Sequence, residues 1–175
     1  MQLTKPQFGY TLVECLVALA IVSVLTSMAV PSFRQLRIDA QQRHVIHQLE
    51  AAVSAARHWA LTEGVLATLC GHDLRASPDL QTPVLNPLCA EHYSTGAAVW
   101  LQGRQGWRLR RAWDWEEYVV RNRSGSREAG EQIVFSPGGL ANRNMTWSTC
   151  AGGANLSLVL NRIGRPISRK NWGQC

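Results

Sequence analysis

The sequence predicts an α+β fold in which one long N-terminal helix packs against antiparallel β-strands. Three observations support this class. An apolar run spans residues 10–30, apolar residues then recur at steps of three and four up to residue 60, and short segments rich in valine, threonine and aromatic residues follow from residue 65. The 175 residues suffice for one modest globular domain and an anchor.

The first predicted element is a transmembrane helix. Residues 10–30 read YTLVECLVALAIVSVLTSMAV, in which Glu14 is the one charged residue. At a rise of about 1.5 Å per residue, this run matches the roughly 30 Å hydrocarbon core of a bilayer. A secretory signal would have a shorter apolar core and small residues around a cleavage site beyond it, which the Pro31 region lacks. Because a carboxylate in a bilayer is costly, Glu14 is a functional candidate, with snorkelling to the interface as the alternative.

An amphipathic helix is predicted for residues 32–64, ending near Gly64. Its apolar positions follow the helical period: Ile46, Leu49, Val53, Ala56 and Ala60. Since this face must be buried, we expect the remainder of the chain to be built against it.

The period changes beyond this helix, and residues 65–175 predict a β-rich domain. Seven segments have the composition of strands: 65–69, 97–101, 107–113, 117–121, 132–135, 145–150 and 155–161. Glycine-rich turn signals separate several of them, and the stretch 151–154 predicts a hairpin between the last two.

The chain has five cysteines, of which Cys15 lies in the apolar run. The other four lie in polar surroundings suited to disulfides: Cys70, Cys89, Cys150 and Cys175. Four cysteines allow three pairings, and we favour the one with the shortest loops, Cys70 with Cys89 and Cys150 with Cys175. His72 and His92 suggest a zinc site with the first pair, but the spacing is not a common ligand pattern, so we predict no metal.

The charge and the sequence motifs restrict the classes of function that this chain can have. The low share of charged residues, 17% against a typical 25% or so, argues against disorder. The formal net charge of +6 admits an anionic partner. No phosphate loop, dinucleotide fingerprint or H-E-x-x-H motif is present, so we predict neither enzymatic activity nor a cofactor.

The C-terminal segment is the strongest candidate for an anionic partner. It has four basic residues, no acidic residue and one aromatic: Arg162, Arg165, Arg169, Lys170 and Trp172. Such a segment can bind phosphates and stack on a base, so we hypothesise DNA binding, with a solvated basic surface as the alternative. A second basic group adjoins Trp107 near the predicted strand 107–113 and consists of Arg104, Arg108, Arg110 and Arg111.

The N-terminal residues Lys5-Pro6-Gln7-Phe8-Gly9-Tyr10-Thr11-Leu12-Val13-Glu14 resemble the class III signal of type IV pilins and type II secretion pseudopilins. The resemblance implies that prepilin peptidase cleaves between Gly9 and Tyr10 and that Tyr10 is methylated. It implies that Glu14 is needed for filament assembly, paired with the N-terminal amine of a neighbouring subunit. Pro31 matches the proline that ends or kinks the family's apolar half-helix.

The C-terminal half resembles the H-type pseudopilin (GspH) and FimT/FimU minor-pilin group. The matching features are Phe135-Ser136-Pro137-Gly138-Gly139, the strand ending in Cys150, and Gly164-Arg165. The resemblance implies a pilin-like fold and a structural subunit that primes assembly of a type IV pilus through contacts with other pilins. The alternative is a type II secretion pseudopilin. In the FimT branch a G-R-x-R motif binds DNA; here the first arginine matches and the second is displaced.

Together these features predict four parts: a leader at 1–9, a transmembrane segment at 10–31, an amphipathic helix at 32–64 and an exported domain at 65–175. We expect a single-pass protein of the inner membrane with a periplasmic domain, which later forms part of a pilus or pseudopilus.

Overall fold

The computed structural model describes residues 11–73, 82–151 and 154–174, which contain one α-helix and eight β-strands. The chain forms two compact units, one that ends at Ile38 and one that begins at Asp39. The predicted α+β class is confirmed, because a single long helix is followed by antiparallel sheets.

Helix α1 spans Leu12–Glu63. It continues through Pro31, so this proline does not end the apolar part, and both predicted helical segments belong to one element. The helix ends before Gly64, which has φ +65°, the left-handed conformation that glycine adopts readily after a helix.

Hydroxyl groups within the apolar part of α1 bond to the helix itself. Ser23 donates to the carbonyl of Ala20 at 2.7 Å, and Thr26 donates to the carbonyl of Val22 at 2.9 Å. Polar groups in a bilayer must find partners inside the protein, and these bonds provide them.

The first sheet has the strand order β3-β2-β1-β5, and all pairs are antiparallel. Its strands are β1 (Ala67–Gly71), β2 (Gly96–Gly103), β3 (Gly106–Asp114) and β5 (Ile133–Phe135). The register shifts between Val99, which pairs with Arg111, and Trp100, which pairs with Leu109. Arg110 is therefore the extra residue of a β-bulge.

The second sheet has the order β4-β6-β7-β8. Its strands are β4 (Val120–Arg121), β6 (Met145–Ala151), β7 (Ala154–Leu160) and β8 (Pro166–Lys170). The predicted hairpin is present, since Ala151 pairs with Ala154. β8 was not predicted, and of the predicted strand 117–121 only Val120–Arg121 pairs as a strand.

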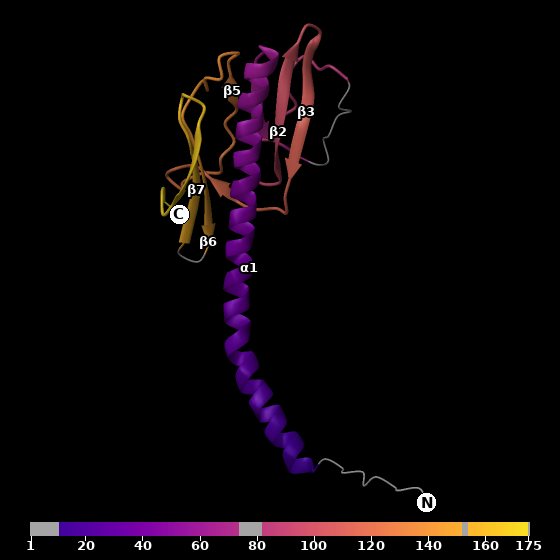
Figure 1. The fold of residues 1–175 in the computed structure, drawn as a ribbon, viewed down its shortest axis with the longest axis vertical. Coiled ribbons are helices and arrows are strands. Elements are labelled where there is room, and N and C mark those ends of the chain that lie inside the picture. Colours follow the sequence, from indigo (N-terminus) through magenta and orange to yellow (C-terminus); the bar gives the residue numbers. More distant parts are fainter. Residues whose placement is uncertain (1–10, 74–81, 152–153, 175) are drawn as a thin grey trace, which may run out of the picture. The chain divides into compact units, whose positions relative to one another are not determined.

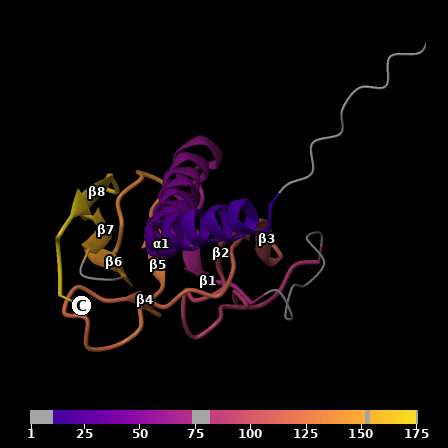
Figure 2. The ribbon, with the colours of Figure 1, turned by 90° about the horizontal axis from the view of Figure 1, so that it is seen from below.

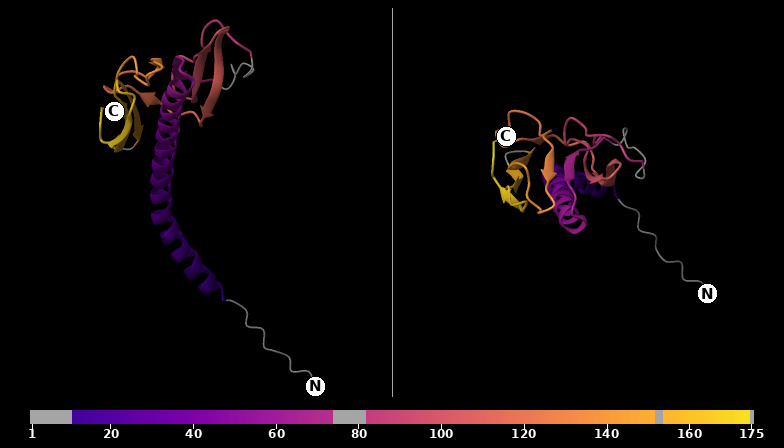
Figure 3. Two further views of the ribbon diagram at one scale, coloured as in Figure 1. Left: turned by 45° about the horizontal axis from the view of Figure 1, so that its top comes forward. Right: turned by 90° about the horizontal axis from the view of Figure 1, so that it is seen from above.

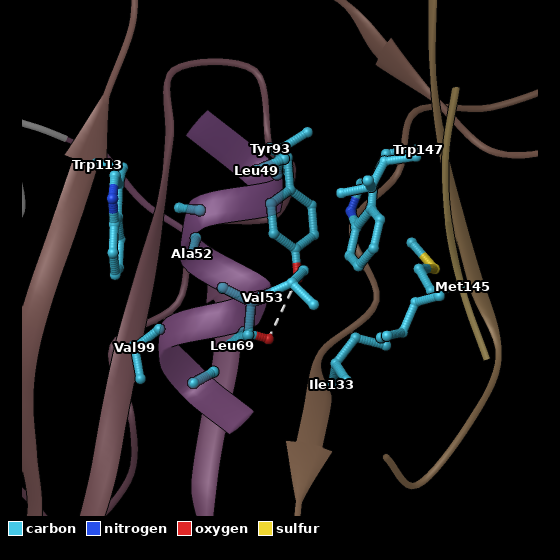
Figure 4. Close-up of a cluster of buried hydrophobic side chains, with 14 of the residues drawn as sticks. Leu49, Ala52, Val53, Leu69, Tyr93, Val99, Trp113, Ile133, Met145 and Trp147 are labelled. Carbon is cyan, nitrogen blue, oxygen red and sulfur yellow. Dashed lines mark hydrogen bonds between the residues drawn. The ribbon is translucent and has the colours of Figure 1, made fainter. Parts of the chain in front are cut away.

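The two sheets enclose the end of α1 that belongs to the second unit (Figures 1 and 3). The predicted apolar face is buried in full: Ile46, Leu49, Val53, Ala56 and Ala60. Figure 4 shows Val99 and Trp113 on one side of this helix and Ile133, Met145 and Trp147 on the other. The helix thus packs against both sheets and forms one hydrophobic core with them.

Tyr93 links the elements of this core. Its ring meets Trp147 edge to face at a centroid distance of 5.7 Å, and its hydroxyl lies 3.2 Å from the carbonyl oxygen of Leu69 (Figure 4). Burial raises the pKa of the Tyr93 phenol far above its usual range, so the hydroxyl stays protonated and can donate.

A smaller core covers the other face of the first sheet. It consists of Cys70, Ala98, Trp100 and Leu109, with Val84 and Cys89 packed against it. A disulfide joins Cys70 to Cys89, so it ties the segment before β2 onto β1. Such a cross-link stabilises the fold mainly by restricting the unfolded chain.

Candidate assembly site and basic surface

Glu14 caps the start of α1. Its Oε2 accepts the backbone N–H of Thr11 at 2.9 Å and the Thr11 hydroxyl at 3.0 Å, while the Glu14 N–H donates to Oγ1 of Thr11 at 3.3 Å. This is a capping box, for which Thr-x-x-Glu before an apolar run is the sequence signal. The sequence analysis assigned Glu14 a role in filament assembly and did not predict this local cap.

The cap leaves part of the carboxylate for another partner. All three bonds use Oε2 of Glu14 or atoms of Thr11, and none uses Oε1. A carboxylate can accept about four hydrogen bonds, so a cation from a second chain could bind without breaking the cap.

The surface of α1 around Glu14 is apolar and exposed. Its most apolar 18-residue window has a mean hydropathy of 2.3, and none of the window is buried, so by length and composition the helix can cross a membrane. Leu16 and Leu25 are more than half exposed. The predicted cleavage residues Gly9 and Tyr10 lie outside the described residues.

The cysteines bear on the zinc alternative. Cys70 and Cys89 are bonded to each other, so their sulfurs are not available as thiolate ligands. His72 lies 3.7 Å from Asp114, and no cluster of metal-binding side chains occurs in the part of the chain that the structure describes. Cys150 is also disulfide-bonded; its predicted partner, Cys175, lies outside the described residues, and that pairing stays a prediction.

The structure divides the predicted basic tail between two places. Arg162 and Arg165 lie in the turn between β7 and β8, where the Arg162 carbonyl accepts the Ala141 N–H at 3.0 Å. Arg169 and Lys170 lie in β8. Successive residues of a strand point to opposite faces, so these two side chains do not share a surface.

Arg169 shares a surface with Trp172 and with a residue from a distant part of the chain. Its guanidinium carbon lies 4.8 Å from the Trp172 ring centroid, and that of Arg123 lies 5.1 Å from the same centroid. Cation–π contacts of this kind fix the position of each guanidinium. Trp172 therefore serves as an intramolecular platform for two arginines, and Arg123 is a member that sequence reasoning did not associate with the tail.

A buried polar network holds Trp172 in place. Asn155 Nδ2 donates to the carbonyl oxygens of Trp172 and Gly173, each at 3.1 Å, and the Ser157 hydroxyl also donates to the Trp172 carbonyl. The segment then runs back to the loop after β4, where Gln174 N donates to the Arg123 carbonyl at 2.9 Å (Figure 2). The C-terminal segment is thus an ordered part of the second sheet's surface.

The second basic group is also organised by tryptophans. The Arg110 guanidinium lies 5.5 Å from the Trp59 ring and 3.7 Å from a Glu63 carboxylate oxygen, and that of Arg111 lies 5.0 Å from the Trp113 ring. Arg110 thus packs β3 onto α1, which gives it a structural role, whereas Arg111 contacts a ring of its own strand.

A capped apolar helix whose far end is enclosed by two antiparallel sheets defines the class of membrane-anchored pilins and pseudopilins. Residues 4–30 match the model of the prokaryotic N-terminal methylation motif, and residues 45–164 match that of the type II transport protein GspH. The chain belongs to the GspH family, which comprises minor pilins and pseudopilins of type IV pili and type II secretion systems. Members of this class assemble with other pilins and are processed by prepilin peptidase; the class is structural.

Solved structures show the same fold. The type IV minor pilin FimU of Pseudomonas aeruginosa in space group P21 has a TM-score of 0.53 and 13% identity, covering 75% of this chain and 90% of that chain. The same protein in space group P65 has a TM-score of 0.51 and 14% identity, covering 73% of this chain and 91% of that chain. No curated protein matches the chain.

Proposed function

We propose that this protein is a minor subunit of a type IV pilus that helps to prime filament assembly. The observation that carries this proposal is the methylation motif at residues 4–30, which includes the start of an apolar helix capped by Glu14. The two solved structures described above are both of a type IV minor pilin, and for this reason we propose the pilus as the system; the family model itself includes secretion pseudopilins.

The proposed processing follows from this motif. Prepilin peptidase cuts between Gly9 and Tyr10, Tyr10 is methylated, and residues 1–9 are removed. Residues 10–31 then anchor the chain in the inner membrane, residues 32–64 carry the domain, and residues 65–175 lie in the periplasm. During assembly the apolar helix leaves the bilayer and packs against those of other pilins.

Glu14 is the proposed assembly residue. In the filament its Oε1, which the cap does not use, accepts the N-terminal amine of a neighbouring subunit, while Oε2 keeps the Thr11 cap. A charge in apolar packing needs an opposite charge, and removing one partner of such a pair costs about 3–5 kcal/mol.

Complementation of a deletion strain tests this proposal. Deletion should abolish or strongly reduce piliation and leave protein secretion intact, and the wild-type gene should restore pili. Glu14→Gln keeps a carbonyl oxygen that can accept the Thr11 N–H but removes the charge. We expect this variant to accumulate in the membrane, where immunoblots would detect it, and to give at least about tenfold fewer pili, because it lacks the charge pair.

Two outcomes would count against these assignments. Loss of secretion with normal piliation would identify the chain as a type II secretion pseudopilin, the alternative function. Full restoration of pili by Glu14→Gln would show that the cap, which this variant keeps, is the whole role of Glu14.

A second role, DNA capture during uptake, is supported by the uncompensated charge of the C-terminal region. Arg162, Arg165, Arg169 and Lys170 form no ion pair with any residue that the structure describes. Phosphate contacts by such residues supply sequence-independent affinity that falls as salt rises.

Charge reversal of Arg165, Arg169 and Lys170 to glutamate should abolish the gel shift of a duplex DNA fragment at low salt. Each phosphate contact that is lost would also flatten the salt dependence of binding by about 0.9 in the slope of log K against log salt. Reversal of Arg104, Arg108 and Arg111 is the matched control, with the same change in net charge. Equal losses in both triple variants would indicate a net-charge effect and would exclude the tail as a specific site.

A further inference from the structure

A groove of about 860 Å³ lies over one face of the second sheet. Its floor includes Thr146 of β6 and Val159 of β7, which pair directly with each other. Opposed residues of an antiparallel pair project from the same face, and the next residue of β6, Trp147, belongs to the core around α1. The floor is therefore the sheet face turned away from that core, and the volume falls within the roughly 300–1,000 Å³ that is usual for ligand sites.

Hydrogen bonds fix the walls of this groove. One wall is the C-terminal segment, where the carbonyl oxygen of Trp172 accepts a hydrogen bond from Asn155 Nδ2 at 3.1 Å. Another wall is the loop after β4, which contributes Arg123. Gln174 N donates to the Arg123 carbonyl at 2.9 Å and so joins the two walls. A site that is already ordered loses less conformational entropy when a ligand binds.

A buried hydroxyl in the groove lacks a partner. Thr146 is 9% exposed, lines the groove and forms no side-chain hydrogen bond with any residue that the structure describes. Ser148, the next residue of β6 on the same face, lies 2.8 Å from the hydroxyl of Ser157 and is thereby satisfied. Buried polar side chains are normally hydrogen-bonded, because an unpaired one costs free energy. A ligand in the groove would supply the partner that Thr146 lacks.

The groove also has an uncompensated positive charge. Arg127 is neutralised by Glu131 at 3.0 Å, whereas Arg123 forms no ion pair within the described parts of the chain. The guanidinium carbon of Arg123 lies 5.1 Å from the centre of the Trp172 ring, which positions it. A guanidinium binds a carboxylate through two parallel hydrogen bonds, so this charge favours a ligand with a carboxylate group.

The remaining polar groups favour hydroxyl groups on the same ligand. Asn144 and Asn161 line the groove, and since Asn161 Oδ1 accepts the backbone N–H of Arg165 at 3.1 Å, its Nδ2 is left to donate. Amides and the Thr146 hydroxyl can each donate and accept, as a sugar hydroxyl does. The Trp172 ring already contacts two guanidiniums, which disfavours a nucleobase that would bind by stacking.

We propose that this groove binds hexuronic acid units of an acidic polysaccharide, with the sugar carboxylate on Arg123 and sugar hydroxyls on Thr146 and Asn144. The arginine supplies the preference for an acidic sugar, and the hydroxyl and amide groups distinguish a sugar from other anions. The site is separate from the apolar helix and, apart from Trp172, from the residues proposed for DNA capture.

The test uses the full chain in non-ionic detergent micelles and fluorescein-labelled tetragalacturonate, with fluorescence anisotropy as the readout. We expect saturable binding that weakens at least about tenfold for the methyl ester of the same oligosaccharide, which keeps the hydroxyls but has no charge. Labelled tetraglutamate, which carries the carboxylates without the sugar hydroxyls, should also bind at least about tenfold more weakly. Both comparisons change only the probe, so they do not depend on how a variant folds.

Protein variants then locate the site. Thr146→Val keeps the shape of the side chain and should weaken binding about fivefold. Its thermal midpoint should not fall, because it breaks no hydrogen bond within the described protein. Arg123→Gln should weaken binding at least about tenfold, whereas Arg104→Gln, the same charge change in the turn between β2 and β3, should change it less than about twofold.

Several results would overturn the proposal. Equal binding of the acid and its ester would remove the role of Arg123, and equal binding of tetraglutamate would indicate a general anion surface. Equal losses in the two arginine variants, unchanged binding by Thr146→Val, or no binding at millimolar oligosaccharide would each exclude the site. Displacement of the sugar by a single-stranded oligonucleotide whose own binding weakens with Thr146→Val and Arg123→Gln would assign the groove to nucleic acid instead.

Discussion

Replacement of Trp147 by alanine is expected to lower the free energy of unfolding by about 3–5 kcal/mol, because it leaves a large cavity in the core. The Trp147 side chain is fully buried between β6 and α1 and makes the edge-to-face contact with Tyr93. Urea denaturation of the detergent-solubilised chain, followed by near-UV circular dichroism, would measure the loss.

Trp147→Phe is the matched control. The Trp147 indole N–H is buried and has no hydrogen-bond partner among the described residues, so phenylalanine breaks no hydrogen bond there. It keeps an aromatic ring against Tyr93 and should cost about 1–2 kcal/mol, within the range for a small loss of core volume. An alanine variant that loses less than 1 kcal/mol would contradict the central place of Trp147 in the core.

Gly71→Ala is expected to destabilise the domain by about 3 kcal/mol, at the upper end of the usual cost of overpacking. A Cβ atom at this position would lie 2.1 Å from the backbone oxygen of His92 and 2.7 Å from its carbonyl carbon. Neither β1 nor the segment that contains His92 can easily move: the Gly71 carbonyl accepts the Ala90 N–H at 2.9 Å, and Cys70 is tied to Cys89.

Gly138→Ala provides the comparison for this variant. A Cβ atom at Gly138 would meet only the Ser136 hydroxyl oxygen, at 3.8 Å, and Gly138 does not have a positive φ. Alanine there should be neutral or should stabilise by up to about 1 kcal/mol through the unfolded state. Thermal unfolding of the two variants side by side measures the contrast, and similar midpoints would refute the steric argument for Gly71.

Local patterns predicted the helix and most of the strands. The steps of three and four that end at Ala60 placed its apolar face correctly, because helical geometry depends only on neighbouring residues. β8 was not predicted, because it begins with Pro166, is mostly exposed and has no alternation of apolar and polar residues. It becomes a strand only through pairing with β7, as between Val159 and Ile167.

The site was predicted less completely than the fold. The Glu14 cap could have been predicted from Thr11, which lies three residues before it. The contact of Arg123 with Trp172 could not, because the two residues come together only when β4 and β8 join the same sheet. Likewise, the division of Arg169 and Lys170 between two faces depends on a strand that local composition did not indicate.

The sequence by itself determined the family, the apolar helix with its capped glutamate, and the apolar face on which the domain is built, since each is encoded by residues close together in the chain. Only the tertiary structure decided which basic residues share a surface and that β4 pairs with only two residues of β6. These depend on strand pairing between distant segments, whose partners and extent are chosen by packing around α1 and not by local propensity.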